Sequence, residues 1–150
     1  MGSITRRRVI AALAAGTLTA GCLAEEPEEP HQAVVHQSPT CACCDAYVEY
    51  LEEELGVTVS VEETDDMAAV KDTFDIPSTL ESCHTLEYRD FVFEGHLPAA
   101  VIEAFLEEPP AVPGIALPGM PAGSPGMGGS KDEEWTVYTL DEDQSVYTTY

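Results

Sequence analysis

Residues 33–61, AVVHQSPTCACCDAYVEYLEEELGVTVSV, decide the fold of this chain. The apolar run at 33–36 is typical of a buried strand, and residues 38–40 supply a turn and a candidate helix cap. Behind that turn, apolar side chains recur at the spacing of one helical face, at Cys44, Tyr47, Val48, Leu51 and Leu55. Gly56 ends the helix, and alternating residues at 57–61 predict a second strand. The stretch therefore predicts a β-α-β unit whose helix begins with cysteines.

The chain beyond this unit predicts one more helix, two more strands and a third helix. Residues 64–66 cap a second helix that places Met67, Val70 and Phe74 on its inner face, and Pro77 closes the segment. Strands at 85–88 and 91–93 join at Arg89-Asp90, and Pro98 opens a helix that carries Val101, Ile102, Phe105 and Leu106. The order is β-α-β-α-β-β-α, read as two parallel crossover units, a hairpin and a helix. It predicts an α/β, thioredoxin-like fold.

Two C-terminal segments follow this core. Residues 109–129 are rich in Pro, Gly and Met, with three Pro-Gly pairs that mark turns. A long loop of this kind in a small domain is usually functional or disordered. Residues 135–140 and 145–150 predict a C-terminal hairpin around an acidic turn.

The N-terminus predicts export from the cytoplasm. Thr5-Arg6-Arg7-Arg8 followed by apolar residues has the twin-arginine form, and the apolar stretch is shorter than the roughly 20 residues that span a bilayer. Small residues before Cys22 resemble a lipoprotein box, in which Cys22 becomes the lipidated first residue; ordinary cleavage near Ala20 is the alternative. We expect a signal peptide at 1–21, a lipidated acidic tether at 22–31 and a metal-binding domain at 32–150. The domain would then be anchored to the outer face of the cytoplasmic membrane.

The charge of the chain excludes some partners. The formal net charge is −22, and loss of the leader would leave Lys71, Arg89 and Lys131 against 28 acidic residues. Like charge repels nucleic acid and anionic membrane surfaces, so contact with a membrane is expected through the lipid alone. At about 1 M salt the Debye length falls to about 3 Å, which screens such self-repulsion and suggests a halophilic host. Acidic tails that only aid solvation would be the simpler explanation, but acids also lie within the expected helices.

The cysteines suggest soft-metal ligation. Cys41, Cys43 and Cys44 lie within four residues, more sulfur than one disulfide uses, and Cys83 precedes the third strand. Free N–H groups at a helix start stabilise thiolates, and in a thioredoxin-like arrangement the loop before that strand faces the helix start. Four thiols should therefore converge.

The cysteine cluster could bind one of several metals or could form two disulfides. Adjacent helical residues point about 100° apart, which disfavours one tetrahedral zinc and favours several Cu(I) ions that share bridging thiolates. Several Cu(I) ions would also neutralise the thiolate charge. Zinc, an iron–sulfur centre and two disulfides stay open, although a Cys43–Cys44 bond or an isolated Cys41–Cys44 bridge would be strained.

Other candidate ligands are less distinctive. His84, beside Cys83, is a candidate ligand or an exposed bystander, and His96 is expected to shape the junction before the third helix. His31 and His36 have no chemical neighbours in the sequence. Met120 and Met127 on the Pro/Gly/Met-rich loop could cover a Cu(I) site or serve as apolar filler.

Five motifs occur here in one order: Cys41-Ala42-Cys43-Cys44, residues 63–67 (ETDDM), residues 82–85 (SCHT), residues 94–99 (EGHLPA) and residues 117–127 (LPGMPAGSPGM). Together they resemble the CopG-type copper-linked metal-binding family, long catalogued as a domain of unknown function and distinct from the ribbon-helix-helix repressors of that name. The resemblance spans residues 34–147. It implies an exported thioredoxin-like protein linked to copper resistance, with copper bound by Cys41, Cys43, Cys44 and Cys83, and a copper oxidoreductase role has been suggested for such proteins. Ala42 stands where the family commonly has glycine.

The sequence thus leads to one main hypothesis and two rivals. The first is an extracytoplasmic protein that binds more than one Cu(I) for copper resistance or homeostasis, with copper redox or transfer to copper-handling proteins. The second is a thiol–disulfide oxidoreductase in which Cys41 attacks and Cys44 resolves. The third is a structural zinc module.

Overall fold

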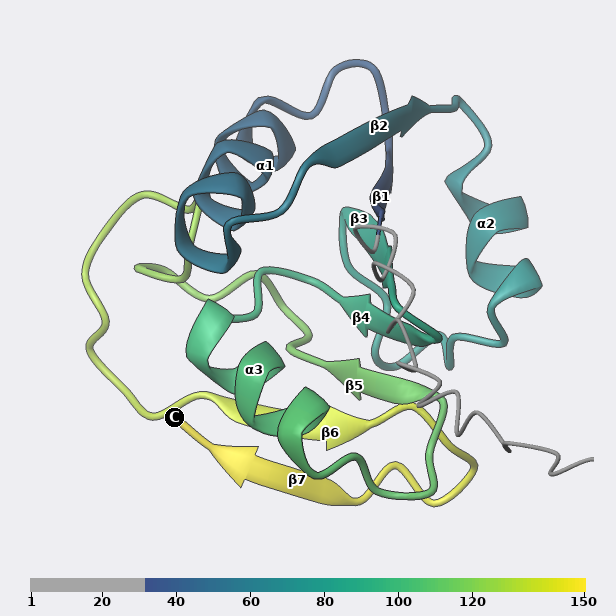
Figure 1. The fold of residues 1–150 in the computed structure, drawn as a ribbon, viewed down its shortest axis with the longest axis vertical. Helices are drawn as coiled ribbons and strands as arrows, with labels where there is room; N and C mark the ends of the chain where they lie inside the picture. The colour runs from purple at the N-terminus through teal and green to yellow at the C-terminus, as the bar shows by residue number, and fades with distance from the viewer. Residues whose placement is uncertain (1–31) are drawn as a thin grey trace, which may run out of the picture.

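The computed structural model describes residues 32–150 as a single mixed sheet with helices on both faces (Figure 1). The predicted leader, the lipidation site Cys22 and the tether lie outside the described residues. The strands are β1 (Ala33–Gln37), β2 (Val59–Glu63), β3 (His84–Tyr88), β4 (Phe91–Glu94), β5 (Gly114–Ala116), β6 (Thr136–Thr139) and β7 (Val146–Thr149). The helices are α1 (Ala42–Leu55), α2 (Met67–Thr73) and α3 (Ala99–Glu107). None of these helices is long and apolar enough to cross a membrane.

The predicted order β-α-β-α-β-β-α is confirmed, and the chain is a mixed α/β protein. The sheet has the order β2-β1-β3-β4-β5-β6-β7. β1 and β2 are parallel, as the first crossover requires, but β3 runs antiparallel to β1, with His36 opposite Thr85. The expectation of a second parallel crossover was therefore wrong. The reversal places the start of β3 beside the end of β1, where α1 begins; the thioredoxin-like label itself stays a prediction.

Two apolar clusters hold the helices against the sheet. The larger cluster packs α1 and α3 on one face through Tyr47, Leu51, Ile102 and Phe105, all of them fully buried. The smaller cluster lies on the α2 side and includes Ile76 and Leu80, with Phe74 packed against it. Burial of this apolar surface is the main source of stability for both layers.

Helix α2 differs from its predicted pattern. Asp66 caps it as expected, because its carboxylate accepts a hydrogen bond from the Ala69 N–H. Met67 and Val70 are only half-buried, however, whereas Lys71 is 3% exposed. The side chain that α2 sends fully into the interior is thus a cation, which a rule based on apolar spacing cannot find.

The Pro/Gly/Met-rich loop contains a strand that the sequence did not predict. β5 is only three residues long and pairs with β4 in parallel, with Phe93 opposite Ile115. A Cβ at Gly114 would collide with the carbonyl of Val92, so glycine is needed for this close approach. β5 also pairs with β6, and β6 with β7. The predicted C-terminal hairpin is confirmed and extends the same sheet.

Candidate metal centre

The cysteine triplet lies at the first turn of α1. Cys41 is the N-cap residue, with φ −90° and ψ 83°, so its backbone is outside the helix. Its carbonyl accepts from the Cys44 N–H at 3.0 Å, and its own N–H donates to the Ser38 carbonyl at 3.1 Å. No side chain caps the helix, which corrects the expectation that residues 38–40 do so. The first turn therefore keeps N–H groups available to stabilise charge on sulfur.

A disulfide joins Cys41 to Cys44, with 5.3 Å between their Cα atoms. The Cys41–Cys44 bridge was expected to be unfavourable, but a non-helical Cys41 places its side chain on the same side as Cys44. Cys43 and Cys83 are free thiols, both half-buried. The four cysteines of residues 32–150 thus form one disulfide, and the alternative of two disulfides among them does not describe this state.

The four sulfurs converge as predicted. Cys41 Sγ lies 3.4 Å from Cys43 Sγ, and Cys44 Sγ lies 3.5 Å from Cys83 Sγ. All four sulfurs lie within 4.8 Å of one another. The argument that helical geometry disfavours one shared site for the three neighbouring cysteines was therefore wrong, because it treated Cys41 as helical. With Zn–S bonds of about 2.3 Å, tetrahedral sulfurs lie roughly 3.8 Å apart, so the spacing accommodates a single ion as well as a cluster.

Two histidines extend this group of donors. Cys83, His84 and His96 form a second set whose ligand atoms lie within 4.8 Å of one another. Cys83 Sγ is 3.1 Å from His96 Nε2 and 3.5 Å from His84 Nδ1. Both histidines are fully buried, so His84 is no exposed bystander and His96 does more than shape a helix junction. Sequence reasoning underrated His96, although its position two residues after a strand paired with β3 was a usable signal.

The hydrogen bonds of His96 fix its tautomer. Its Nδ1 lies 2.7 Å from the Pro125 carbonyl, which can only accept, so Nδ1 carries the proton. In the neutral ring, Nε2 then presents its lone pair toward Cys83. Metal-ligating histidines commonly donate the other ring N–H to a carbonyl in this way.

Burial governs the ionisation of this group in the absence of metal. Burial, followed by the charges of His96 and Lys71, holds the pKa of His84 well below its usual value, and burial also lowers the pKa of His96. Burial, followed by the neighbouring Cys43, raises the pKa of the Cys83 thiol to about 11. The site is therefore built from neutral imidazoles and a protonated thiol, and metal binding must displace the proton from Cys83.

Tyr47 and the segment 124–127 enclose the histidines. The Tyr47 ring lies 4.6 Å from the His84 ring and 5.1 Å from the His96 ring, and its hydroxyl donates to the Leu97 carbonyl at 2.8 Å. A Cβ at Gly126 would lie 2.8 Å from the Cys43 carbonyl, so this loop rests directly on the first turn of α1. Met127 follows it and is half-buried, whereas Met120 is 39% exposed. A ligand role for either methionine stays a prediction.

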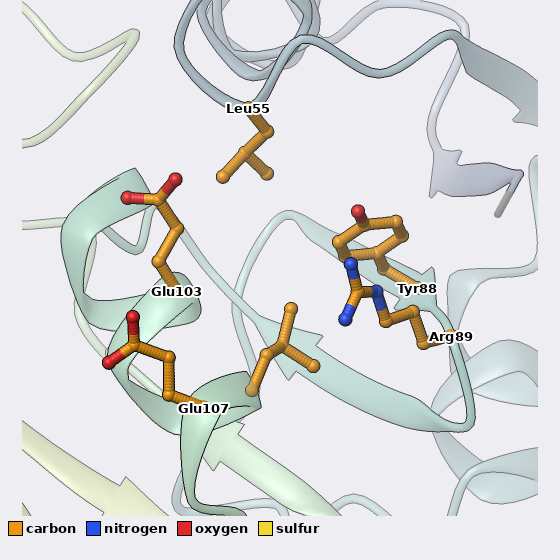
Figure 2. Close-up of a pocket in the computed structure, with 6 residues that line it drawn as sticks. Leu55, Tyr88, Arg89, Glu103 and Glu107 are labelled. Carbon is orange, nitrogen blue, oxygen red and sulfur yellow. The ribbon is translucent and has the colours of Figure 1, made fainter. Parts of the chain in front are cut away.

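A pocket elsewhere on the surface is separate from this centre. Its volume is about 460 Å³, and it lies between the end of α1, the β3–β4 turn and α3 (Figure 2). Its lining consists of Leu55, Tyr88, Arg89, Glu103, Leu106 and Glu107, with no thiol or imidazole. The pocket therefore shares no residue with the cysteine cluster.

Comparisons with known sequences and solved structures identify relatives of this chain. A family model described as a protein of unknown function, DUF411, matches residues 80–127. A solved structure titled copper resistance protein CopG, form 2, is 38% identical, covers 81% of this chain and 99% of its own, and superposes with a TM-score of 0.72. The chain belongs to the CopG family. A second CopG structure, form 1, is 37% identical over 81% of this chain and 98% of its own, also with a TM-score of 0.72. No curated protein sequence matches the chain.

The buried histidines of this CopG-family protein should make its stability pH-dependent. His84 and His96 have depressed pKa values in the folded state, whereas in the unfolded chain they titrate near 6.5. Above that pH both states are neutral and the full stability is present. As pH falls below about 6.5 the unfolded chain binds protons first, so the free energy of unfolding should decrease by about 1.4 kcal/mol per unit of depression. Urea unfolding of the metal-free protein between pH 7 and 5 measures this slope. A His84→Gln variant should have a shallower slope, and identical slopes would contradict the assignment.

Proposed function

We propose that the chain is a Cu(I)-binding protein of copper resistance or homeostasis. The observation that carries this proposal is the convergence of Cys41, Cys43, Cys44 and Cys83, with His84 and His96 against Cys83, in a chain similar to proteins titled copper resistance protein CopG. Thiolate is a soft donor that favours Cu(I), and imidazole suits copper in either oxidation state. The donor set fits copper well, since it combines both ligand types around one sulfur, Cys83.

The number of donors favours more than one copper ion. Two ligand sets share Cys83, one of four thiols and one of a thiol with two imidazoles. Copper(I) is stable with two or three ligands, so a bridging Cys83 can serve both sets without further donors. Each bound monovalent ion also offsets one thiolate charge, which suits a protein of net charge −22.

The oxidation state of Cys41 and Cys44 would control how much copper the site can bind. With Cys41 and Cys44 in a disulfide, only Cys43 and Cys83 of the described cysteines remain as thiols. Reduction supplies two electrons and two protons and restores four thiols. We therefore propose that the reduced protein is the form that holds copper, and that copper redox or transfer to copper-handling proteins takes place at this site. Export and lipid anchoring at Cys22 would place it outside the cytoplasm.

Anaerobic metal analysis tests the proposal. The purified protein, reduced and offered copper and zinc together, should retain several coppers per chain. Cys83→Ser should lose most of this copper, because Cys83 belongs to both ligand sets. Val146→Ala, at an exposed position outside both ligand sets, is the control and should keep full loading. One zinc per chain, or no metal, would overturn the copper proposal.

The disulfide supports a second candidate, a thiol–disulfide oxidoreductase. Cys41, at the helix N-cap, would attack a substrate disulfide and Cys44 would resolve the mixed disulfide, which yields the bridge seen here. This activity needs only one pair of thiols. Cys83→Ser should then largely preserve reductase turnover while copper binding is lost, so the same variant separates the two functions.

A further inference from the structure

A buried ion pair lies behind the metal centre. Lys71 of α2 and Glu94 at the end of β4 are 3% and 0% exposed, and Lys71 Nζ lies 2.6 Å from Glu94 Oε1. Desolvation of two charges is costly, and an apolar pair of similar size often gives equal or greater stability. A gain in folding stability is therefore not a sufficient explanation for this buried pair.

The pair holds both sides of the Cys83-His84 dipeptide. Glu94 Oε1 accepts the backbone N–H of Ser82 at 2.5 Å, and Glu94 Oε2 accepts the hydroxyl of Thr85 at 2.8 Å. Lys71 Nζ donates to the same hydroxyl at 2.8 Å. Ser82 and Thr85 are the residues directly before and after the two donors. One carboxylate thus fixes the backbone that presents a thiol and an imidazole.

Glu94 also connects this dipeptide to the third donor. His96 follows Glu94 by two residues, and Gly95 between them has φ +81°. A Cβ at Gly95 would clash with the Leu117 carbonyl and lie 3.1 Å from Ser82 Oγ. The Glu94 carbonyl accepts from the Leu117 N–H at 2.9 Å. The backbone around Glu94 is therefore packed tightly against the segment that carries Cys83.

We propose that Glu94, with its charge balanced by Lys71, is a positioning residue that holds Cys83, His84 and His96 in one arrangement for copper. Its side chain touches no donor atom, so it acts through the backbone of residues 82–85. The inference rests on the proposed copper function for its consequence, but the positioning itself concerns the metal-free protein. Outer contacts of this kind typically change metal affinity about 10–100-fold when lost.

Two double variants separate positioning from charge. In Lys71→Met/Glu94→Gln, the amide oxygen can still accept from the Ser82 N–H and the amide N–H₂ can donate to Thr85. In Lys71→Met/Glu94→Leu, the volume is filled but both hydrogen bonds are lost. The readouts are the alkylation rate of Cys83 in the metal-free protein and the affinity for Cu(I). Cys43, the other free thiol and outside these contacts, is the internal control for alkylation.

We expect the Gln variant to resemble the parent in both readouts. The Leu variant should show Cys83 alkylation faster by about 25-fold, about fivefold for each of the two hydrogen bonds that no longer oppose local opening, with Cys43 unchanged. Its Cu(I) affinity should fall about 10–100-fold. Equal Cys83 rates and affinities in the two variants would overturn the proposal.

Thr85→Val provides a second test should the Leu variant not fold. This substitution removes one hydroxyl group and leaves Lys71 and Glu94 paired. Valine is favoured in β-strands, so the variant should keep β3 intact. Faster alkylation of Cys83 alone supports positioning, and an unchanged rate contradicts it. If the parent protein binds no copper, the proposed function fails, and the alkylation data still decide whether Glu94 positions Cys83.

Discussion

Replacement of Gly126 by alanine should displace segment 124–127 from the metal centre and weaken Cu(I) binding about 10–100-fold. Gly126 has φ +76°, and an added Cβ would lie 2.8 Å from the Cys43 carbonyl and 2.9 Å from the Tyr47 N–H nitrogen. Both atoms belong to the hydrogen-bonded backbone of α1, which cannot give way, so the loop must move. Pro125 would then release His96 Nδ1, and the fixed tautomer that points Nε2 at Cys83 would be lost. Competition titration with a Cu(I) chelator measures the affinity, and the ¹⁵N shifts of His96 report the tautomer.

Two other glycines of the same loop provide matched controls. Gly128 has nothing within 4 Å of an added Cβ, so Gly128→Ala should leave both readouts unchanged. Gly119 has φ +82° but equally open surroundings, so Gly119→Ala should cost about 1–2 kcal/mol from the backbone alone and spare the site. If all three variants bind copper alike, the loop has no role in holding His96.

Replacement of Phe105 by alanine should have the largest effect on stability, a loss of about 3–5 kcal/mol in the free energy of unfolding. Phe105 is fully buried on α3 and lies edge-on to the rings of Phe91 and Phe93 at 5.0 and 5.5 Å. It also contacts Tyr147 of β7 at 5.6 Å. Truncation would leave a cavity between α3, β4 and β7. Since small domains have about 5–15 kcal/mol in all, much of the stability would be lost.

Chemical denaturation of the metal-free protein measures this loss. Val146→Ala is the control, because Val146 is 59% exposed and truncation there should change stability by no more than about 0.5 kcal/mol. A loss below about 1 kcal/mol for Phe105→Ala would mean that the sheet relaxes around the cavity.

Local patterns were sufficient to predict most elements of the fold. The apolar spacing of α1, the Asp66 cap and Pro98 before α3 each act within a few residues, and the structure has them where they were expected. Strand direction and pairing depend on contacts far apart in sequence, and here the expectation of a parallel β3 was wrong. β5 was missed because three residues show no periodicity, and a parallel partner, β4, is what makes them a strand.

The candidate site shows the same division between local and distant information. The four cysteines were found from their spacing and from the place of Cys83 before β3, and the sulfurs do meet. His96 was undervalued because its partner, the Pro125 carbonyl, lies 29 residues away in a segment without regular structure. The buried Lys71–Glu94 pair was also invisible, since α2 exposes acids and half-buries its apolar residues. A buried charged residue can be identified only when the structure shows the oppositely charged residue that pairs with it.

The outer surface of residues 32–150 is predominantly negative, because it exposes many acidic residues and only two of the three cations. Lys71 is buried, the Arg89 guanidinium lies over the Tyr88 ring, and Lys131 Nζ lies 4.8 and 4.5 Å from the rings of Trp135 and Tyr150. In dilute buffer the resulting negative field would draw any cation toward the protein and speed its arrival. At about 1 M salt the field reaches only about 3 Å, so the rate at which cations reach the protein no longer depends on its net charge. If the proposed copper function holds, selection among metals would then depend on the sulfur and imidazole ligands at short range.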